Sequence, residues 1–139
     1  MRFTGRLTLE TSGHSHVLDI TAAVMEQVQR SKIRDGLVCV FVPGSTAAIT
    51  TTEAEPGLLN HDLRAFFDRV VPDDIPYRHE DTWSDDNGHS HVRASLVGPS
   101  VALPLIDGAI PLGKWQHVVL IDFDTRGRRR ELIVQVVGE

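Results

Sequence analysis

The sequence predicts a single α+β domain in which a largely antiparallel sheet folds into a β-sandwich flanked by two helices. Short alternating or continuously apolar runs separated by turn signals dominate the chain, and these are typical of strands. Only two stretches show helical spacing of apolar residues. The 139 residues contain no repeat, low-complexity tract or linker, so we expect one domain over residues 1–139.

The N-terminal region predicts two strands and a helix. Residues 2–10 alternate between apolar and polar side chains, which indicates a half-buried strand. A turn signal follows, and a short strand over residues 16–20 would complete an opening hairpin. Asp19 or Thr21 can cap a helix that runs to about Ser31.

The middle of the chain predicts a central strand and the second helix. Residues 37–42 are continuously apolar, the pattern of a strand covered on both faces, and Cys39 within this run is expected to be a core thiol. An extended stretch over residues 47–52 follows. A helix with an apolar stripe is expected from residue 58 to residue 71, and Pro72 ends it.

The C-terminal half predicts an acidic loop and then strands. Residues 72–88 are rich in aspartate and lack periodicity, so we expect a long loop. Asp107-Gly108, between two apolar runs, is a strong hairpin signal. The expected strands cover residues 89–97, 100–106, 110–112, 115–123 and 128–137.

Charge and composition disfavour several classes of function. The chain has 14 Lys and Arg against 19 Asp and Glu, a formal net charge of −5, which disfavours nucleic acid as a partner. No apolar stretch approaches the length of a membrane span, and no signal peptide is recognisable at the N-terminus. We therefore expect a cytoplasmic protein that binds neither nucleic acid nor membrane.

Three histidines suggest a metal centre. On the expected strand, His89 and His91 would point to the same face, where two imidazoles can converge on one divalent ion. His79 lies ten residues before His89 and is the candidate third ligand, which would leave a coordination position open. Imidazole ligands favour zinc, whereas magnesium prefers oxygen. The alternative is a pair of solvated surface histidines.

Four further residues are candidates for the site. Glu53 ends an extended stretch and is either a base or ligand, or simply a carboxylate flanking a helix. Asp62 lies outside the apolar stripe of the second helix, where a solvated aspartate is common. Ser45 and Thr46 follow a buried strand, and their hydroxyls and nearby amides could hold a small anion, although a plain turn fits as well.

The only basic cluster lies near the C-terminus. On the last expected strand Arg128 and Arg130 share a face, and their guanidinium groups suit phosphate or carboxylate. The alternative is a charged sheet edge that prevents association.

Several motifs keep their order along nearly the whole chain: Ser45-Thr46-Ala47-Ala48-Ile49-Thr50, Glu53, Asp62, Tyr77-Arg78-His79, Asn87-Gly88-His89-Ser90-His91, Leu96-Val97-Gly98-Pro99-Ser100, Leu112-Gly113-Lys114-Trp115-Gln116 and the Arg-rich terminal strand ending in Gly138-Glu139. On these motifs the sequence resembles the YjbQ family. The resemblance implies a homotrimer built from β-sandwich subunits flanked by helices. It also implies a secondary thiamine-phosphate synthase activity, which joins a pyrimidine methyl diphosphate to a thiazole phosphate and releases pyrophosphate.

The resemblance also assigns site residues. The polar cluster of the family would fall on Glu53, Asp62, His79, His89 and His91, with Arg128 or Arg130 as phosphate partners. Many members have a histidine where this chain has Gly44, so one imidazole of the usual cluster is absent here.

Two functional hypotheses follow. The first is an enzyme that acts on a small phosphorylated or anionic substrate at a divalent metal, with thiamine-phosphate synthesis as a side activity for which magnesium would suit the diphosphate. The second is a non-catalytic homotrimer that binds a metal or a small metabolite at the subunit boundary. A purely structural module has the least support, because it gives no purpose to the polar cluster.

Overall fold

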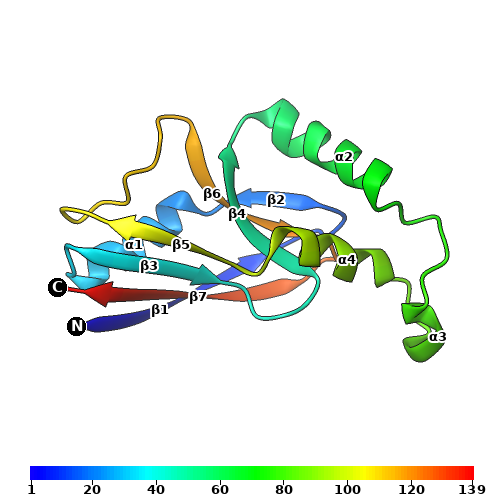
Figure 1. Ribbon diagram of the computed structural model, residues 1–139, viewed down its shortest axis with the longest axis horizontal. Coiled ribbons are helices and arrows are strands. Elements are labelled where there is room, and N and C mark those ends of the chain that lie inside the picture. The colour runs from blue at the N-terminus through cyan, green and yellow to red at the C-terminus, as the bar shows by residue number, and fades with distance from the viewer.

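The computed structural model describes all 139 residues and confirms the α+β class, with two antiparallel sheets packed against each other (Figure 1). The elements, in chain order, are β1 (Arg2–Glu10), β2 (His16–Asp19), α1 (Thr21–Ser31), β3 (Gly36–Phe41), β4 (Ala47–Glu53), the π-helix η1 (Leu58–Asp62), α2 (Leu63–Val70), α3 (His79–Trp83), α4 (Gly88–Val97), β5 (Ser100–Leu105), β6 (Gln116–Asp122) and β7 (Arg129–Gly138). Both termini lie at the end of the molecule opposite α3 (Figure 1).

The main core lies between the two sheets. One sheet has the strand order β1-β7-β3-β5 and the other has the order β2-β6-β4. Alternate residues of each strand point into this core, and α1 packs Val24 and Val28 against it. A second, smaller cluster joins α2 and α4 to the outer face of the three-stranded sheet through Phe67 and Ala94. The outer face of the four-stranded sheet has no helix over it (Figure 1).

The first predicted helix is confirmed, but the opening hairpin is wrong. Ile20, and neither Asp19 nor Thr21, occupies the N-cap position of α1, but Asp19 lies beside it and its Oδ1 atom accepts hydrogen bonds from the backbone N–H (3.0 Å) and the hydroxyl (2.6 Å) of Thr21, the first residue of the helix. However, β1 pairs with β7 and β2 pairs with β6, so the first two strands belong to different sheets. Gly13, His14 and Ser15 have φ angles of 69°, 55° and 65°, and this left-handed run redirects the chain between the sheets.

The prediction that residues 37–42 are covered on both faces is also wrong. Leu37 and Phe41 of β3 are 58% and 37% exposed, and Cys39, on the same face, is partly buried. The strand that is buried on both faces is β6, where Val118 to Ile121 are all at most 2% exposed. The continuous apolar runs of β3 and β6 both indicated strands correctly. They did not show that the helices cover β6 and leave one face of β3 exposed.

The largest error concerns residues 89–97, which form α4 and not a strand. The buried positions of α4 include His89, Arg93 and Ala94, a spacing of four and five residues that places them on one side of a helix. The polar-apolar alternation of this segment is accidental. Gly98, with φ of 97°, ends the helix and leads into β5.

Smaller differences between the predicted and the observed elements occur before and after α4. The expected loop over residues 72–88 contains the short helix α3. The Asp107-Gly108 turn is present, but residues 110–112 form no strand, because only one bridge, between Ile106 and Ala109, continues the hairpin. The helix expected over residues 58–71 begins as η1 and continues as α2. No helix is long and apolar enough to cross a membrane.

Candidate functional site

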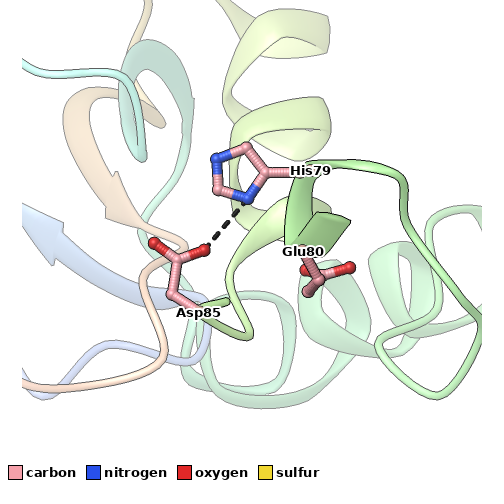
Figure 2. A group of neighbouring side chains, drawn as sticks. All are labelled: His79, Glu80 and Asp85. Carbon is pink, nitrogen blue, oxygen red and sulfur yellow. Dashed lines mark ion pairs between the residues drawn. The ribbon is translucent and has the colours of Figure 1, made fainter. Parts of the chain in front are cut away.

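Three side chains that can bind a metal meet beside α3. His79, Glu80 and Asp85 each offer a ligand atom, and these atoms lie within 4.8 Å of one another. The shortest separation is 3.0 Å, between His79 Nδ1 and Asp85 Oδ1 (Figure 2). Glu80 also accepts a hydrogen bond of 3.0 Å from the backbone N–H of Gly88, which fixes its carboxylate.

Local backbone geometry produces this cluster. α3 ends at Ser84, whose φ of 56° turns the chain back so that Asp85 faces His79 (Figure 2). Gly88 begins α4 in close contact with the same segment, and a Cβ atom there would lie 2.7 Å from Tyr77 Cβ and 2.9 Å from Glu80 Oε1. Glycine at position 88 therefore permits the approach that holds Glu80 in place.

The geometry of His79 and Asp85 suits two ligands of one cation. His79 Nδ1 is buried and makes no hydrogen bond, although the Asp85 carboxylate is 3.0 Å away. Ligand atoms at bond lengths of about 2.0–2.2 Å from a shared ion lie roughly 3.0–3.5 Å apart in octahedral or tetrahedral geometry. The 3.0 Å separation therefore fits both the ion pair of His79 with Asp85 and two ligands of one ion.

His91 is the second imidazole at this site. It lies in the first turns of α4, and its ring centroid is 4.6 Å from that of His79. Its Nδ1 atom is 3.1 Å from the carbonyl oxygen of Ser45. A carbonyl can only accept a hydrogen bond, so Nδ1 carries the proton and Nε2 keeps a free lone pair. Ser45 thus contributes its carbonyl to the orientation of His91.

His89 does not join the other two histidines. Two residues along an α-helix are about 200° apart around its axis, so the prediction that His89 and His91 share a face is wrong. The His89 side chain is buried, with its ring centroid 6.2 Å from that of Tyr77. Burial, reinforced by the nearby charge of Arg93, lowers the pKa of His89.

Thr46 and Arg130, predicted to bind substrate, are buried and engaged with aspartates. Arg130 donates to both Asp122 oxygens, from Nε at 2.7 Å and from Nη2 at 2.9 Å. Its Nη2 also donates to the Thr46 hydroxyl at 2.8 Å, and this hydroxyl donates to Asp124 at 2.9 Å. Burial acts to raise the pKa of Asp122, but the hydrogen bonds from Arg130 and Thr11 outweigh it and keep that pKa below 3.8.

A polar cavity of about 230 Å³ lies next to the cluster of His79, Glu80 and Asp85. Asp85 belongs to both, and Asp86, Asp124, Arg126 and Arg128 also line the cavity. Arg128 donates to Asp124 at 2.9 Å through Nε, whereas Arg126 is exposed and has no ion pair. Three carboxylates and two guanidinium groups give this lining a formal charge of 2 − 3 = −1, which a divalent ion would change to +1.

The remaining predicted residues lie elsewhere in the subunit. Glu53 is exposed at the far end of β4, six residues beyond Ala47, which is about 20 Å along a strand. Asp62 is exposed on η1 and lies 2.8 Å from His61 Nδ1. Within one chain, neither carboxylate reaches His79. Conversely, no ligand role was predicted for Glu80 or Asp85, although the acidic composition of residues 72–88 was a signal for them.

Comparison with known proteins gives one consistent result. The family model described as UPF0047 protein YjbQ-like matches residues 5–139. A UPF0047 protein from Archaeoglobus fulgidus is 38% identical over 128 residues, covering 91% of this chain and 96% of its own. YjbQ from Escherichia coli O157:H7 is 30% identical over 140 residues and covers 100% of both chains.

Solved structures show the same fold. A YbjQ-like protein of unknown function from Sulfolobus solfataricus P2 superposes with a TM-score of 0.94 at 29% identity, covering 100% of this chain and 99% of that one. A YjbQ/UPF0047 family protein from Clostridium acetobutylicum gives a TM-score of 0.86 at 34% identity, with 96% and 99% covered.

Proposed function

We propose that this chain, which belongs to the YjbQ-like UPF0047 family, is a metal-dependent enzyme that acts on a small phosphorylated substrate. The observation that carries the proposal is the convergence of His79, Glu80 and Asp85, whose ligand atoms lie within 4.8 Å of one another. Two carboxylates beside one imidazole leave an excess of negative charge, which a bound cation would neutralise.

The donor set indicates which ions would fit. His79, Asp85 and Glu80 supply one nitrogen and carboxylate oxygens, and the free Nε2 lone pair of His91 is a further donor nearby. Mixed imidazole and carboxylate ligands suit zinc or manganese better than magnesium, which prefers oxygen alone.

The adjoining cavity supports an anionic substrate. A divalent ion at Asp85 would lie at its edge, and Arg126 and Arg128 would face the substrate across it. Bound there, the ion supplies a Lewis acid to oxygens that gain charge when a phosphate or diphosphate leaves. Arg126, the unpaired guanidinium, is the residue that we assign to binding the phosphate. Thiamine-phosphate synthesis, which releases pyrophosphate, is chemistry of this kind and is proposed as a secondary activity.

A homotrimer forms part of the proposal. Leu37, Phe41 and Val137 are exposed together on the outer face of the four-stranded sheet, where β3 and β7 are paired. A patch of exposed apolar residues of this kind favours a second copy of the chain as its cover. Glu53 and Asp62 are exposed in the single subunit, so both carboxylates are available to contact a neighbouring subunit in such an assembly.

The test combines metal loading with substrate screening. The protein, loaded in turn with zinc, manganese and magnesium, is assayed for phosphate or pyrophosphate release from small phosphate esters. The pyrimidine methyl diphosphate and thiazole phosphate pair is included. We expect metal-dependent turnover that His79→Ala abolishes and that His61→Ala, at an exposed histidine outside the cluster, leaves unchanged.

The second hypothesis, a non-catalytic binding protein, predicts a different result. It requires that metal binds in a stoichiometric amount, that this binding depends on His79, and that no product forms from any of these substrates. The absence of His79-dependent metal binding would contradict both hypotheses.

A further inference from the structure

A second polar cavity, of about 160 Å³, lies between the loop that precedes β2 and the η1–α2 segment. We propose that this cavity binds a phosphate group, as inorganic phosphate or as the end of a small phosphate monoester. It shares no lining residue with the cavity beside Asp85, so it is a separate site.

The lining of this cavity consists almost entirely of hydrogen-bond donors. Its polar side chains are Ser12, His14, Ser15, His16, Asn60 and Arg64. No carboxylate is among them, although the chain as a whole carries a net charge of −5. A pocket with a guanidinium group, two imidazoles and no acid favours an anion.

The hydrogen bonds of the loop direct its remaining donors to a ligand. His16 Nδ1 accepts the backbone N–H of Ser12 at 3.0 Å, so the proton of the neutral ring is on Nε2, which is a donor. The hydroxyl of Ser15, a residue only 4% exposed, accepts from Arg93 Nη1 at 3.2 Å, and its own proton remains to be donated. Both side chains thus present a donor that no protein acceptor uses.

Arg64 and Asn60 supply donors from the opposite side. The Arg64 guanidinium is exposed and makes no hydrogen bond, and its nearest carboxylate, Asp68, is 3.9 Å away. Asp68 itself accepts a hydrogen bond of 3.2 Å from Arg93, so it is only a weak competitor for Arg64. The amide of Asn60 makes no hydrogen bond within the chain.

The loop is held in a demanding conformation at this cavity. Gly13, His14 and Ser15 are all left-handed, and two of them are not glycine. The backbone N–H of His14 donates to the carbonyl of Asp124 at 2.8 Å, and a Cβ atom on Gly13 would lie 2.5 Å from the carbonyl of Arg126. These contacts preorganise the loop, so a phosphate would bind without reordering it.

The test is a calorimetric titration of the full chain, free of metal so that the lining beside Asp85 keeps its negative charge, with inorganic phosphate and, separately, with glycerol 3-phosphate. Arg64→Gln removes the charge at the cavity. The matched control is Arg69→Gln, which removes an exposed arginine from the same helix outside the cavity. We expect Arg64→Gln to weaken binding of both probes at least tenfold and Arg69→Gln to leave it unchanged.

Two further variants separate this site from the proposed active site. Arg126→Gln and His79→Ala alter the cavity beside Asp85 and its metal cluster, and neither should change phosphate binding at the Arg64 site. Equal affinity of the wild type and Arg64→Gln, or loss of all phosphate binding in Arg126→Gln, would overturn the inference while leaving the metal proposal intact. Binding of glycerol 3-phosphate alone, lost in Arg64→Gln, would support the site and assign it to a monoester.

Discussion

At the scale of single residues, one member of the C-terminal basic cluster has a role other than the predicted one. Arg130 forms a buried ion pair with Asp122. Arg130 and Arg128 were predicted to bind phosphate together, yet only Arg128 reaches a cavity. The side chains of Arg130 and Asp122 are 10% and 0% exposed, and two hydrogen bonds join them. A sequence pattern cannot distinguish an arginine that awaits a ligand from one that neutralises a buried aspartate.

Removal of the Asp122 charge should therefore destabilise the fold. Asp122→Asn removes the carboxylate that binds the buried Arg130 guanidinium through two hydrogen bonds and leaves only Asp124, at 3.9 Å, as its counterion. Breaking a buried pair costs about 3–5 kcal/mol. The control is Glu131→Gln, which breaks the exposed pair with Arg6 and should cost less than about 1 kcal/mol. Urea unfolding measures both. A similar loss in the two variants would contradict this account of Arg130.

The same carboxylates predict an acid dependence. The folded-state pKa values of Asp122 and Asp124 are lowered from 3.8, since hydrogen bonds from Arg130, Arg128 and threonines outweigh the effect of burial. Their contribution to the free energy of unfolding is therefore complete above the unfolded-state pKa and is lost as the pH falls below it.

We expect the wild type to lose stability more steeply than Asp122→Asn as the pH falls below about 4. Urea unfolding at several pH values gives both curves. Parallel curves would show that the Asp122 carboxylate is not held below its usual pKa.

At the scale of elements, strands with a clear period and helices with a clear cap could be predicted from the sequence. β1 and α1 have the expected bounds because alternation and the Asp19-Thr21 signal act locally. α4 could not be predicted in the same way, because its residues 89–97 alternate like a strand, and its helical state depends on packing of Ala94 against Phe67 and Phe123. The sequence correctly placed His79 close to His91. It did not place Asp85 beside His79, because that contact depends on the turn at Ser84.

The docking of α2 gives a prediction with an internal control. Phe67 is 6% exposed and its ring lies 4.8 Å from that of Phe123, whereas the adjacent Phe66 is 54% exposed. Phe67→Ala should destabilise the protein by about 3–5 kcal/mol, and Phe66→Ala by less than about 1.5 kcal/mol. Thermal or urea unfolding measures the difference. If both cost the same, α2 does not pack as described.

At the scale of the whole molecule, the uncovered face of the four-stranded sheet is the feature that a single chain does not explain. The sequence indicated that residues 37–42 are covered on both faces, whereas within one subunit only the inner face is covered. The exposed apolar residues Leu37, Phe41 and Val137 on this face are accounted for if another subunit packs on them, as proposed for the homotrimer.

We expect Leu37→Glu to dissociate the assembly, because it places a charge in the apolar patch that the neighbouring subunit would cover. Sedimentation equilibrium of the wild type should give a mass three times that of the 15.4 kDa chain, and the variant should give a smaller mass. The control is Leu96→Glu on α4, also at an exposed leucine. A wild type that sediments as a single chain would contradict the proposed trimer.

The most direct test of the central claim is a calorimetric zinc titration of the metal-free protein with three variants: His79→Ala, Asp85→Ala and His61→Ala. The account predicts one ion bound per chain, affinity reduced at least about tenfold in the first two variants, and no change in the third. Zinc binding of equal strength in the wild type and His79→Ala, or no binding at all, would contradict it.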